Sequence, residues 1–153
     1  LVRAVDASNA VMEGSSGKSC FGIHICRGNR ASMWHREGSY DGIADYLFNN
    51  LKFDRMLLEY DTERAGGFEP LRFVPKNGPT VVLGLITTKT GDLETVDDLL
   101  GRIEDAQRYI DIDQLALSPQ CGFASGIGGN YLSEDQQWQK FELIMEVAEK
   151  VWG

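Results

Sequence analysis

The stretch Phe21-Gly22-Ile23-His24-Ile25-Cys26 is a short apolar run that places a histidine and a cysteine two positions apart. Side chains of a β-strand alternate between its two faces, so residues two apart point the same way, roughly 6–7 Å from each other. We therefore expect His24 and Cys26 to share one face, where both can reach a single metal ion. The apolar residues of the run would occupy the opposite face. Two ligands on one strand predict that other strands supply the rest.

Three more apolar runs follow, each short and nearly continuous in hydrophobic residues, at 55–60, 80–86 and 114–117. Such runs are typical of parallel strands that are covered on both faces. Segments with helical spacing lie between them, which gives the order β-α-β-α-β-α-β-α and hence a parallel sheet. The sequence therefore predicts the α/β class and a single domain over residues 1–153.

Two of the expected helices have clear boundaries. Residues 95–110 begin with a capping box at Thr95 and Asp98 and carry one apolar stripe: Val96, Leu99, Leu100, Ile103, Ala106 and Ile110. Residues 133–151 begin with another capping box, at Ser133 and Gln136, and Gly153 is placed to end the helix. The expected helix continues through the apolar residues Trp138, Phe141, Leu143, Ile144 and Val147 to Val151. The chain opens without methionine in a helix-like segment, so we expect a piece of a longer protein.

The composition limits the classes of protein that fit. A chain of 153 residues with 42% hydrophobic and 25% charged residues can bury one sizeable core. The formal net charge of -8 argues against nucleic acid or an anionic membrane surface as the main partner. No apolar run reaches the roughly 18–20 residues of a membrane span, and three cysteines do not fit a secreted disulfide framework. We therefore expect a cytoplasmic protein in a reducing compartment.

Further candidate ligands follow later strands. Glu59 ends the second apolar run, and Cys121 lies just past the fourth. The C-terminal ends of strands are also where (β/α)8 barrels place their chemistry. The resulting set offers nitrogen, sulfur and oxygen donors, all of which zinc accepts: His24, Cys26, Glu59 and Cys121. Spacing alone leaves other acids as competitors for the place of Glu59: Asp61, Glu63 and Glu69.

Other residues of the same types fit this site less well. Cys20 lies six residues before Cys26, roughly 20 Å along an extended strand, so we interpret it as a core residue. His35 belongs to a loop and is interpreted as a surface or substrate-loop residue. Four β-α units make half of a (β/α)8 barrel, with a doubly wound sheet as the alternative. Residues 126–129 (Gly-Ile-Gly-Gly) come too far after their strand to form a phosphate-binding turn, and we interpret them as a flexible loop.

Four motifs, taken together, resemble a known family. In chain order they are His24-Ile25-Cys26-Arg27-Gly28-Asn29, Leu58-Glu59-Tyr60-Asp61, Gly84-Leu85-Ile86-Thr87-Thr88-Lys89 and Ser118-Pro119-Gln120-Cys121-Gly122-Phe123. They are similar to the catalytic barrel of the cobalamin-independent methionine synthase family, in particular to its short, single-barrel bacterial and fungal members. The resemblance covers essentially the whole chain. It implies the C-terminal half, strands five to eight, of a (β/α)8 TIM-type barrel, with the N-terminal half missing from this chain.

The resemblance also implies a metal and a reaction. In the family a zinc ion is held by a His-x-Cys pair, a glutamate that ends the next strand and a cysteine after the last strand. These match His24, Cys26, Glu59 and Cys121, so Glu59 becomes the preferred acid. The family transfers a methyl group from a methylated folate to the sulfur of homocysteine. A related branch attaches coenzyme M to epoxides with the same zinc chemistry.

One position departs from the family. Its members carry a histidine after the seventh strand that protonates the leaving amine of the folate, and the matching position here is Lys89. Lys89 is therefore the catalytic candidate, with binding of an anionic substrate or a solvated loop position as alternatives. At the mouth of the barrel, Arg27, Asn29 and Arg30 could bind a substrate carboxylate or sulfonate, or order the loop that runs through Trp34. We take Arg27, Asn29 and Asp61 as the substrate-binding candidates.

The sequence as a whole leads us to expect a zinc-dependent S-methyltransferase. Zinc would activate a small, homocysteine-like thiol for attack on a methyl donor similar to methyl-tetrahydrofolate. Alkyl transfer to coenzyme M or another thiol stays open, and so does a half-barrel that binds zinc without catalysis. The expected partners are the thiol, the methyl or alkyl donor and the missing half of the barrel. Without that half, we expect the chain to be inactive.

Overall fold

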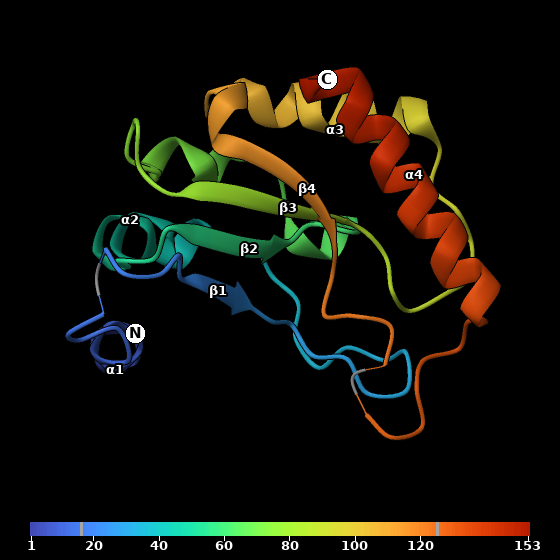
Figure 1. Cartoon of the computed structure of the whole chain (residues 1–153). Helices are drawn as coiled ribbons and strands as arrows, with labels where there is room; N and C mark the ends of the chain where they lie inside the picture. The colour runs from blue at the N-terminus through green and yellow to red at the C-terminus, as the bar shows by residue number, and fades with distance from the viewer. Residues whose placement is uncertain (16, 125) are drawn as a thin grey trace.

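The four expected strands form one parallel sheet in the computed structural model, which describes residues 1–15, 17–124 and 126–153. The strands are β1 (Gly22–Ile25), β2 (Arg55–Glu59), β3 (Thr80–Ile86) and β4 (Leu115–Pro119). Each strand pairs with the one before it in the chain, in the order β1-β2-β3-β4 (Figure 1). The α/β class and the parallel sheet are confirmed. β1 and β4 are the two edges of the sheet.

The described helices are α1 (Val2–Ala10), α2 (Asp41–Asn50), α3 (Val96–Gln107) and α4 (Glu134–Trp152). α3 begins where the sequence predicts, because the Thr95 side chain accepts a hydrogen bond from the backbone N–H of Asp98. α4 has the full capping box between Ser133 and Gln136, and Gly153 caps its C-terminal end. α3 and α4 lie side by side in Figure 1. In the part of the chain that is described, no helix is long and apolar enough to cross a membrane.

The expected strict alternation of strands and α-helices is wrong at the second crossover. Between β2 and β3 the chain forms two short 3-10 helices instead, η1 (Glu63–Ala65) and η2 (Glu69–Phe73). Proline and glycine explain the difference. Pro70 is the second residue of η2, and proline lacks the N–H that an extended α-helix needs. Gly66 has a φ of +76°, and a Cβ there would lie 2.4 Å from Ser39 Cβ, so the chain must bend closely past another segment at this point.

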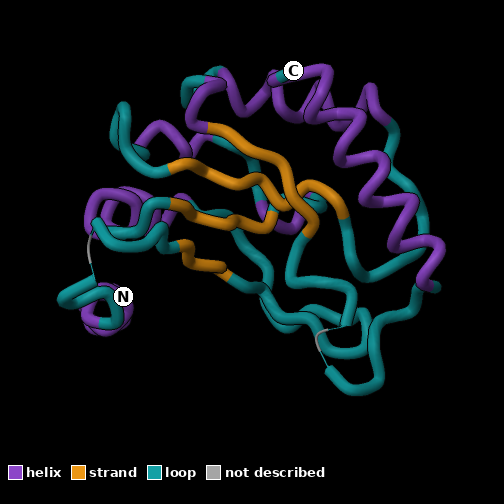
Figure 2. The backbone as a smooth tube through the Cα atoms, viewed as in Figure 1, coloured by secondary structure: helices purple, strands orange, loops and turns teal. Residues whose placement is uncertain are grey.

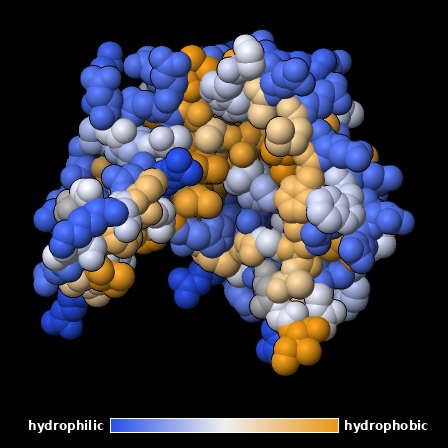
Figure 3. All heavy atoms as spheres, viewed as in Figure 1, coloured by the Kyte–Doolittle hydropathy of each residue, from blue (hydrophilic) through white to orange (hydrophobic). Residues whose placement is uncertain are grey.

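The two faces of the sheet are covered unequally. Alternate strand residues, such as Met56, Leu58 and Leu83, belong to one buried cluster that also contains the inward faces of α2, α3 and α4. Leu57 and Ala116, on the opposite face, are only half-buried. The expectation that every strand is covered on both faces is therefore wrong for the described chain. In the space-filling view of Figure 3, hydrophobic residues gather over the middle of the molecule.

The apolar residues of α4 differ in burial. Trp138 is 56% exposed, while Leu143 and Val147 are buried. Lys140 is fully buried as well. Its ammonium lies 3.1 Å from a carboxylate oxygen of Glu94 and also donates to the carbonyl of Asp92. Because its charge is paired, this lysine can be buried within the packed face of the helix.

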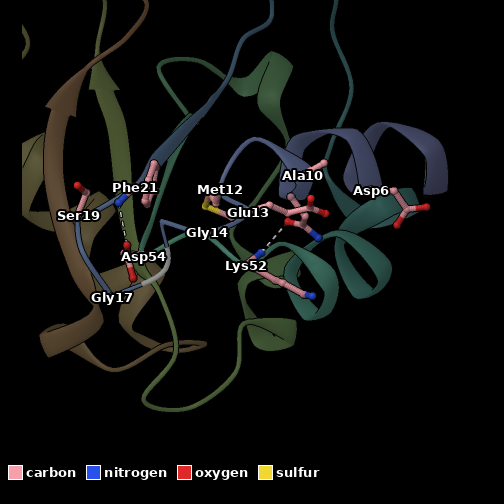
Figure 4. Close-up of a pocket in the computed structure, with 11 residues that line it drawn as sticks. Asp6, Ala10, Met12, Glu13, Gly14, Gly17, Ser19, Phe21, Lys52 and Asp54 are labelled. Atoms are coloured by element: carbon pink, nitrogen blue, oxygen red, sulfur yellow. Dashed lines mark hydrogen bonds between the residues drawn. The ribbon is translucent and has the colours of Figure 1, made fainter.

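α1 lies apart from the sheet and is held by the connection from α2 to β2 (Figure 1). The side chain of Asn9 donates to the carbonyl of Asn50 at 2.8 Å and accepts from the N–H of Lys52 at 3.0 Å. A pocket of about 470 Å³ lies between α1, the turn that follows it and this connection, and Figure 4 shows residues that line it. Phe21 and Asp54, which line the pocket, immediately precede β1 and β2. The pocket therefore lies at the N-terminal ends of the strands.

The opposite ends of the strands are occupied by loops (Figure 2). The loop 26–39 follows β1, and residues 120–132 follow β4. Residues 126–129 lie in this second loop, so their placement outside any helix or strand is confirmed. Since all four strands are parallel, their C-terminal ends lie at one edge of the sheet. This is the edge where the sequence predicts the metal ligands.

Candidate metal centre

Three strands bring the four predicted ligands together. His24 is in β1, Cys26 follows its last residue, Glu59 ends β2 and Cys121 lies two residues after β4. One nitrogen, sulfur or oxygen atom from each residue lies within 4.8 Å of the others. Among the described residues these four form the group of His, Cys, Asp and Glu side chains with a geometry suited to a metal ion. The convergence that the sequence predicts is thus present.

The side-chain atoms that could bind the metal lie close to one another. His24 Nε2 lies 3.3 Å from Glu59 Oε1, and Cys26 Sγ lies 3.2 Å from Cys121 Sγ. Cys121 Sγ lies 2.5 Å from the same Glu59 oxygen. In a tetrahedral zinc site, neighbouring donors are roughly 3.3–3.8 Å apart, because the metal bonds are about 2.0–2.3 Å long. Two of the three pairs lie near this range, and the third would need to open by about 1 Å. The residues fit a zinc ion.

Backbone contacts hold the ligands in place. The N–H of Gly28 donates to Cys26 Sγ at 3.1 Å. Gly28 has a φ of +95°, and a Cβ at this position would lie 2.1 Å from the His35 ring, so only glycine fits. On the next strand, the Glu59 N–H donates to the Tyr40 hydroxyl at 3.2 Å. Glu59 is fully buried, whereas His24 and Cys26 are exposed. The site is therefore open to solvent on the β1 side.

Contacts within the cluster shift the pKa values of its members. Burial opposes the ionisation of Glu59, but hydrogen bonds from His24 and Cys121 and the charge of Lys89 lower its pKa from 4.5 to about 2. The hydrogen bond to Glu59 in turn raises the pKa of His24 above 6.5. Burial and the hydrogen bond donated to Glu59 raise the pKa of Cys121 well above 9.0. Burial also opposes ionisation of Cys26, but its pKa is lowered by hydrogen bonds from Cys121, the Gly28 N–H and His24. Cys26 is the more acidic thiol.

Lys89 lies beside this cluster and is not a solvated loop residue. Its side chain is 6% exposed, and its ammonium donates to Gln120 Oε1 at 2.5 Å. Asp61 Oδ2 is 3.7 Å from the same ammonium. Gln120 directly precedes Cys121, so the contact places Lys89 next to a candidate metal ligand. The alternative of a solvated lysine is therefore wrong.

The substrate-binding candidates have different surroundings. Arg27 is buried, its guanidinium donates to the Gly38 carbonyl, and it lies 4.5 Å from the centre of the Tyr40 ring. These contacts favour the loop-ordering role for Arg27, and Arg30 is exposed.

Asn29 and Asp61 are closer to the residues of the site. Asn29 Nδ2 donates to Thr88 Oγ1 at 3.4 Å and to the Gly122 carbonyl at 3.3 Å, while its Oδ1 is buried without a hydrogen-bond partner among the described residues. The Asp61 carboxylate is engaged by Lys89 and Arg64. Asn29 thus retains an acceptor for a ligand, whereas Asp61 pairs with two cations.

Two residues of ligand type lie outside the site. Cys20 is exposed, so its interpretation as a core residue is wrong. β1 begins only at Gly22, so Cys20 precedes the sheet. His35 is also exposed and is not part of the metal-binding group, in agreement with its interpretation as a loop residue.

Sequence reasoning missed three residues that contact the site: Tyr40, Arg64 and Gln120. Gln120 directly precedes Cys121 in the motif 118–123, so the sequence already indicated that it lies near the site. Arg64 and Tyr40 carried no such signal, because they reach Glu59 from two different connections between strands and only the fold brings them near. Tyr40 accepts a hydrogen bond from the Glu59 N–H, and Arg64 is a charge partner of the Glu59 carboxylate.

The chain is similar in sequence to several known proteins. No family model matches the chain. The chain is 54% and 49% identical, over 130 residues each, to the uncharacterized proteins YxjG and YxjH of Bacillus subtilis (strain 168). It is 28% identical over 120 residues to a methionine synthase of Pyrococcus abyssi. These alignments cover 85%, 85% and 78% of the chain but 34%, 34% and 31% of the relatives. The chain thus spans about a third of the length of the curated relatives it matches.

Two solved structures have the same fold. One is a candidate vitamin-B12-independent methionine synthase from Listeria monocytogenes, with a TM-score of 0.74 and 34% identity, covering 97% of this chain and 40% of that one. The other is a B12-independent methionine synthase from Shewanella sp. W3-18-1 in complex with selenomethionine, with a TM-score of 0.73, 22% identity and coverage of 96% and 42%. The second shows the fold alone. Together with the Pyrococcus relative, the first supports the family of B12-independent methionine synthases without selecting one of its members.

Proposed function

We propose that this chain contributes the metal-binding part of a zinc-dependent S-methyltransferase related to B12-independent methionine synthase. The observation that carries the proposal is the convergence of four donors from three strands at one edge of the sheet. The similarity to B12-independent methionine synthases extends over most of the chain, beyond the four ligands, and it favours methyl transfer as the reaction.

The proposal includes the architecture. Four parallel strands in chain order, with an open edge on each side, correspond to half of a (β/α)8 barrel. The half-buried face of the sheet, which carries Leu57 and Ala116, would line the interior of that barrel. We propose that the chain supplies strands five to eight and that the residues it lacks relative to the similar structures supply the other four. The first partner that we propose for this chain is therefore the remaining half of the barrel.

The donor set would give zinc the charge and softness that thiol chemistry needs. Two cysteines, one histidine and one carboxylate suit zinc, and Glu59 is already held in its ionised form. When bound, zinc would lower the pKa of a homocysteine-like thiol and keep its thiolate available as a nucleophile. The chain's own residues would hold that ion at the C-terminal edge of the sheet.

Lys89 is proposed as the proton donor. Transfer of a methyl group from an amine nitrogen of a methyl-tetrahydrofolate-like donor to a thiolate sulfur leaves that nitrogen in need of one proton. Lys89 carries a transferable proton, and Gln120 and Asp61 hold its ammonium beside Cys121. Asn29, with its unpartnered and buried Oδ1 in the described structure, is the proposed contact for a polar group of the substrate.

Cobalt substitution followed by thiol addition tests the proposal. Co²⁺ replaces zinc in sites of this type and absorbs visible light in a way that depends on its ligands. We expect the cobalt spectrum of the protein to change when homocysteine is added, and we expect thiol-dependent methyl transfer in the full-length protein. Replacing Lys89 by methionine should then lower the rate of transfer and leave the thiol-induced spectral change intact. A spectrum that ignores homocysteine but responds to coenzyme M would favour alkyl transfer to that thiol. One that ignores all thiols would favour zinc binding without catalysis.

A further inference from the structure

Arg64 is a buried arginine that lies directly behind the candidate metal ligands. It belongs to η1, and its side chain is 7% exposed. Its Nη2 lies 2.9 Å and 3.2 Å from the two oxygens of Asp61 and 3.7 Å from Glu59 Oε2. Its Nε donates to Thr62 Oγ1 at 3.0 Å. One guanidinium therefore engages two carboxylates, and one of these is a predicted metal ligand.

The two oxygens of Glu59 have separate surroundings. Oε1 faces the other ligands, at 3.3 Å from His24 Nε2 and 2.5 Å from Cys121 Sγ. Oε2 accepts from the N–H of Arg27 at 3.3 Å and faces Arg64. Because Oε2 already accepts from the Arg27 N–H and pairs with the Arg64 guanidinium, Glu59 is arranged to offer its other oxygen, Oε1, to a metal ion.

Arg64 also contacts the loop 26–39, which begins at Cys26. The centre of its guanidinium lies 4.9 Å from the ring of Trp34, which is 51% exposed. Its carbonyl accepts a hydrogen bond from the N–H of Gly38 at 2.9 Å. Arg64 thus holds the far end of the loop, while the near end of the loop supplies Cys26.

We propose that Arg64 is a positioning residue that fixes Glu59 as a one-oxygen metal ligand and ties this ligand to the loop 26–39 through Trp34. The inference deepens the proposed function and rests on the part of it that makes Glu59 a metal ligand. Groups that contact a metal ligand from behind commonly set its orientation, and losing one weakens metal binding about 10–100-fold. A planar guanidinium can serve Glu59 and Asp61 together, whereas a lysine ammonium acts as a single point charge.

Charge and position act in opposite directions here, which makes the proposal testable. A positive charge near a dication weakens its binding, so removal of Arg64 would strengthen binding if charge alone mattered. If Arg64 acts by position, binding weakens. The variants Arg64→Lys and Arg64→Met separate these effects, since only the first keeps the charge.

The matched control is Arg72→Met. Arg72 also stacks on an aromatic ring, with its guanidinium 4.3 Å from the centre of Phe73, and it lies in η2 near Asp41 rather than behind a metal ligand. Zn²⁺ affinity would be measured by competition with a chromophoric chelator, and the ligand-field bands of the Co²⁺ protein would be recorded. We expect Arg64→Lys and Arg64→Met each to weaken Zn²⁺ binding about 10–100-fold and to shift the Co²⁺ bands, with Arg72→Met unchanged.

Trp34→Ala supplies a variant that leaves the charges in place. We expect it to weaken Zn²⁺ binding several-fold, less than either Arg64 variant, and this readout remains informative if Arg64→Met does not fold. The inference is overturned if Arg64→Lys binds Zn²⁺ as the unaltered protein does while Arg64→Met binds more tightly, or if neither variant moves the Co²⁺ bands. An unaltered protein that binds no metal overturns both proposals. A Co²⁺ spectrum that ignores thiols overturns the catalytic proposal alone.

Discussion

Replacing Cys121 by serine removes one sulfur donor from the candidate metal centre. Cys121 Sγ lies 3.2 Å from Cys26 Sγ and 2.5 Å from Glu59 Oε1, so it contacts two of the other candidate ligands. Cys20→Ser is the matched control, because Cys20 is a free, exposed cysteine outside the cluster. Both changes exchange one sulfur for one oxygen, and they differ only in where the sulfur lies.

The expected size of the effect follows from the number of ligands. Zinc binds to sites built from cysteine and histidine with about 10–16 kcal/mol. Spread over four ligands, this is roughly 2.5–4 kcal/mol for each, or a factor of about 10²–10³ in the dissociation constant. Serine hydroxyl is a poor zinc ligand near neutral pH, because it is not ionised there. We therefore expect Cys121→Ser to weaken Zn²⁺ binding by about 10²–10³-fold and Cys20→Ser to leave it unchanged.

Competition with a chromophoric chelator at fixed pH would measure both affinities. The sulfur-to-metal charge-transfer band of the Co²⁺ protein gives an independent count of bound thiolates. We expect its intensity to fall by about half in Cys121→Ser, since one of two sulfur ligands is lost. The four-ligand site is refuted if Cys121→Ser binds Zn²⁺ as tightly as the unaltered protein, or if Cys20→Ser causes an equal loss.

Three further predictions concern stability and association. Lys140→Met should lower the free energy of unfolding, measured by urea titration, by about 3 kcal/mol, because it leaves Glu94, 3.1 Å from Lys140 Nζ, without its cation. Adding Glu94→Gln should recover part of this loss. A double variant no more stable than Lys140→Met would contradict the prediction. In the metal-free protein, the lowered pKa of Glu59 contributes roughly 3 kcal/mol to the free energy of unfolding above pH 4.5, and this contribution is lost as the pH falls toward about 2. Glu59→Gln should remove this dependence of stability on acid pH. Acid unfolding curves that coincide for the two proteins would count against the prediction. The edges at β1 and β4 predict that the 153-residue chain alone dimerises or aggregates, and a stable monomer in light scattering would show otherwise.

Hydrophobic patterning was sufficient to predict the sheet. Each strand is a short apolar run, and the connecting lengths require parallel pairing, so β1 to β4 follow from local sequence. The same patterning failed between β2 and β3, where Pro70 and Gly66 break a helix that alternation predicts. Apolar spacing also does not show that Lys140 is buried while Trp138 is exposed, because the burial of Lys140 depends on its pairing with Glu94 from a distant part of the chain.

The candidate site divides in a similar way. The four ligands could be predicted because each sits at or near the end of a parallel strand, and parallel strands bring these ends to one edge. The contacts of Lys89 could not, since spacing alone does not distinguish a lysine paired with Gln120 and Asp61 from a solvated one. The role of Arg27 also required the structure, because its guanidinium turns back to Gly38 within its own loop.

By itself, then, the sequence determined the four parallel strands and the ligand types at their ends, because both depend on residues that are near each other in the chain. Tertiary structure decided which further groups surround those ligands. Arg64 and Tyr40 reach Glu59 from two different connections between strands, and Gln120 and Asp61 pair with the buried Lys89. The physical reason is distance along the chain: a strand's alternation is encoded locally, whereas the charge environment of a carboxylate is the sum of groups that only folding brings together.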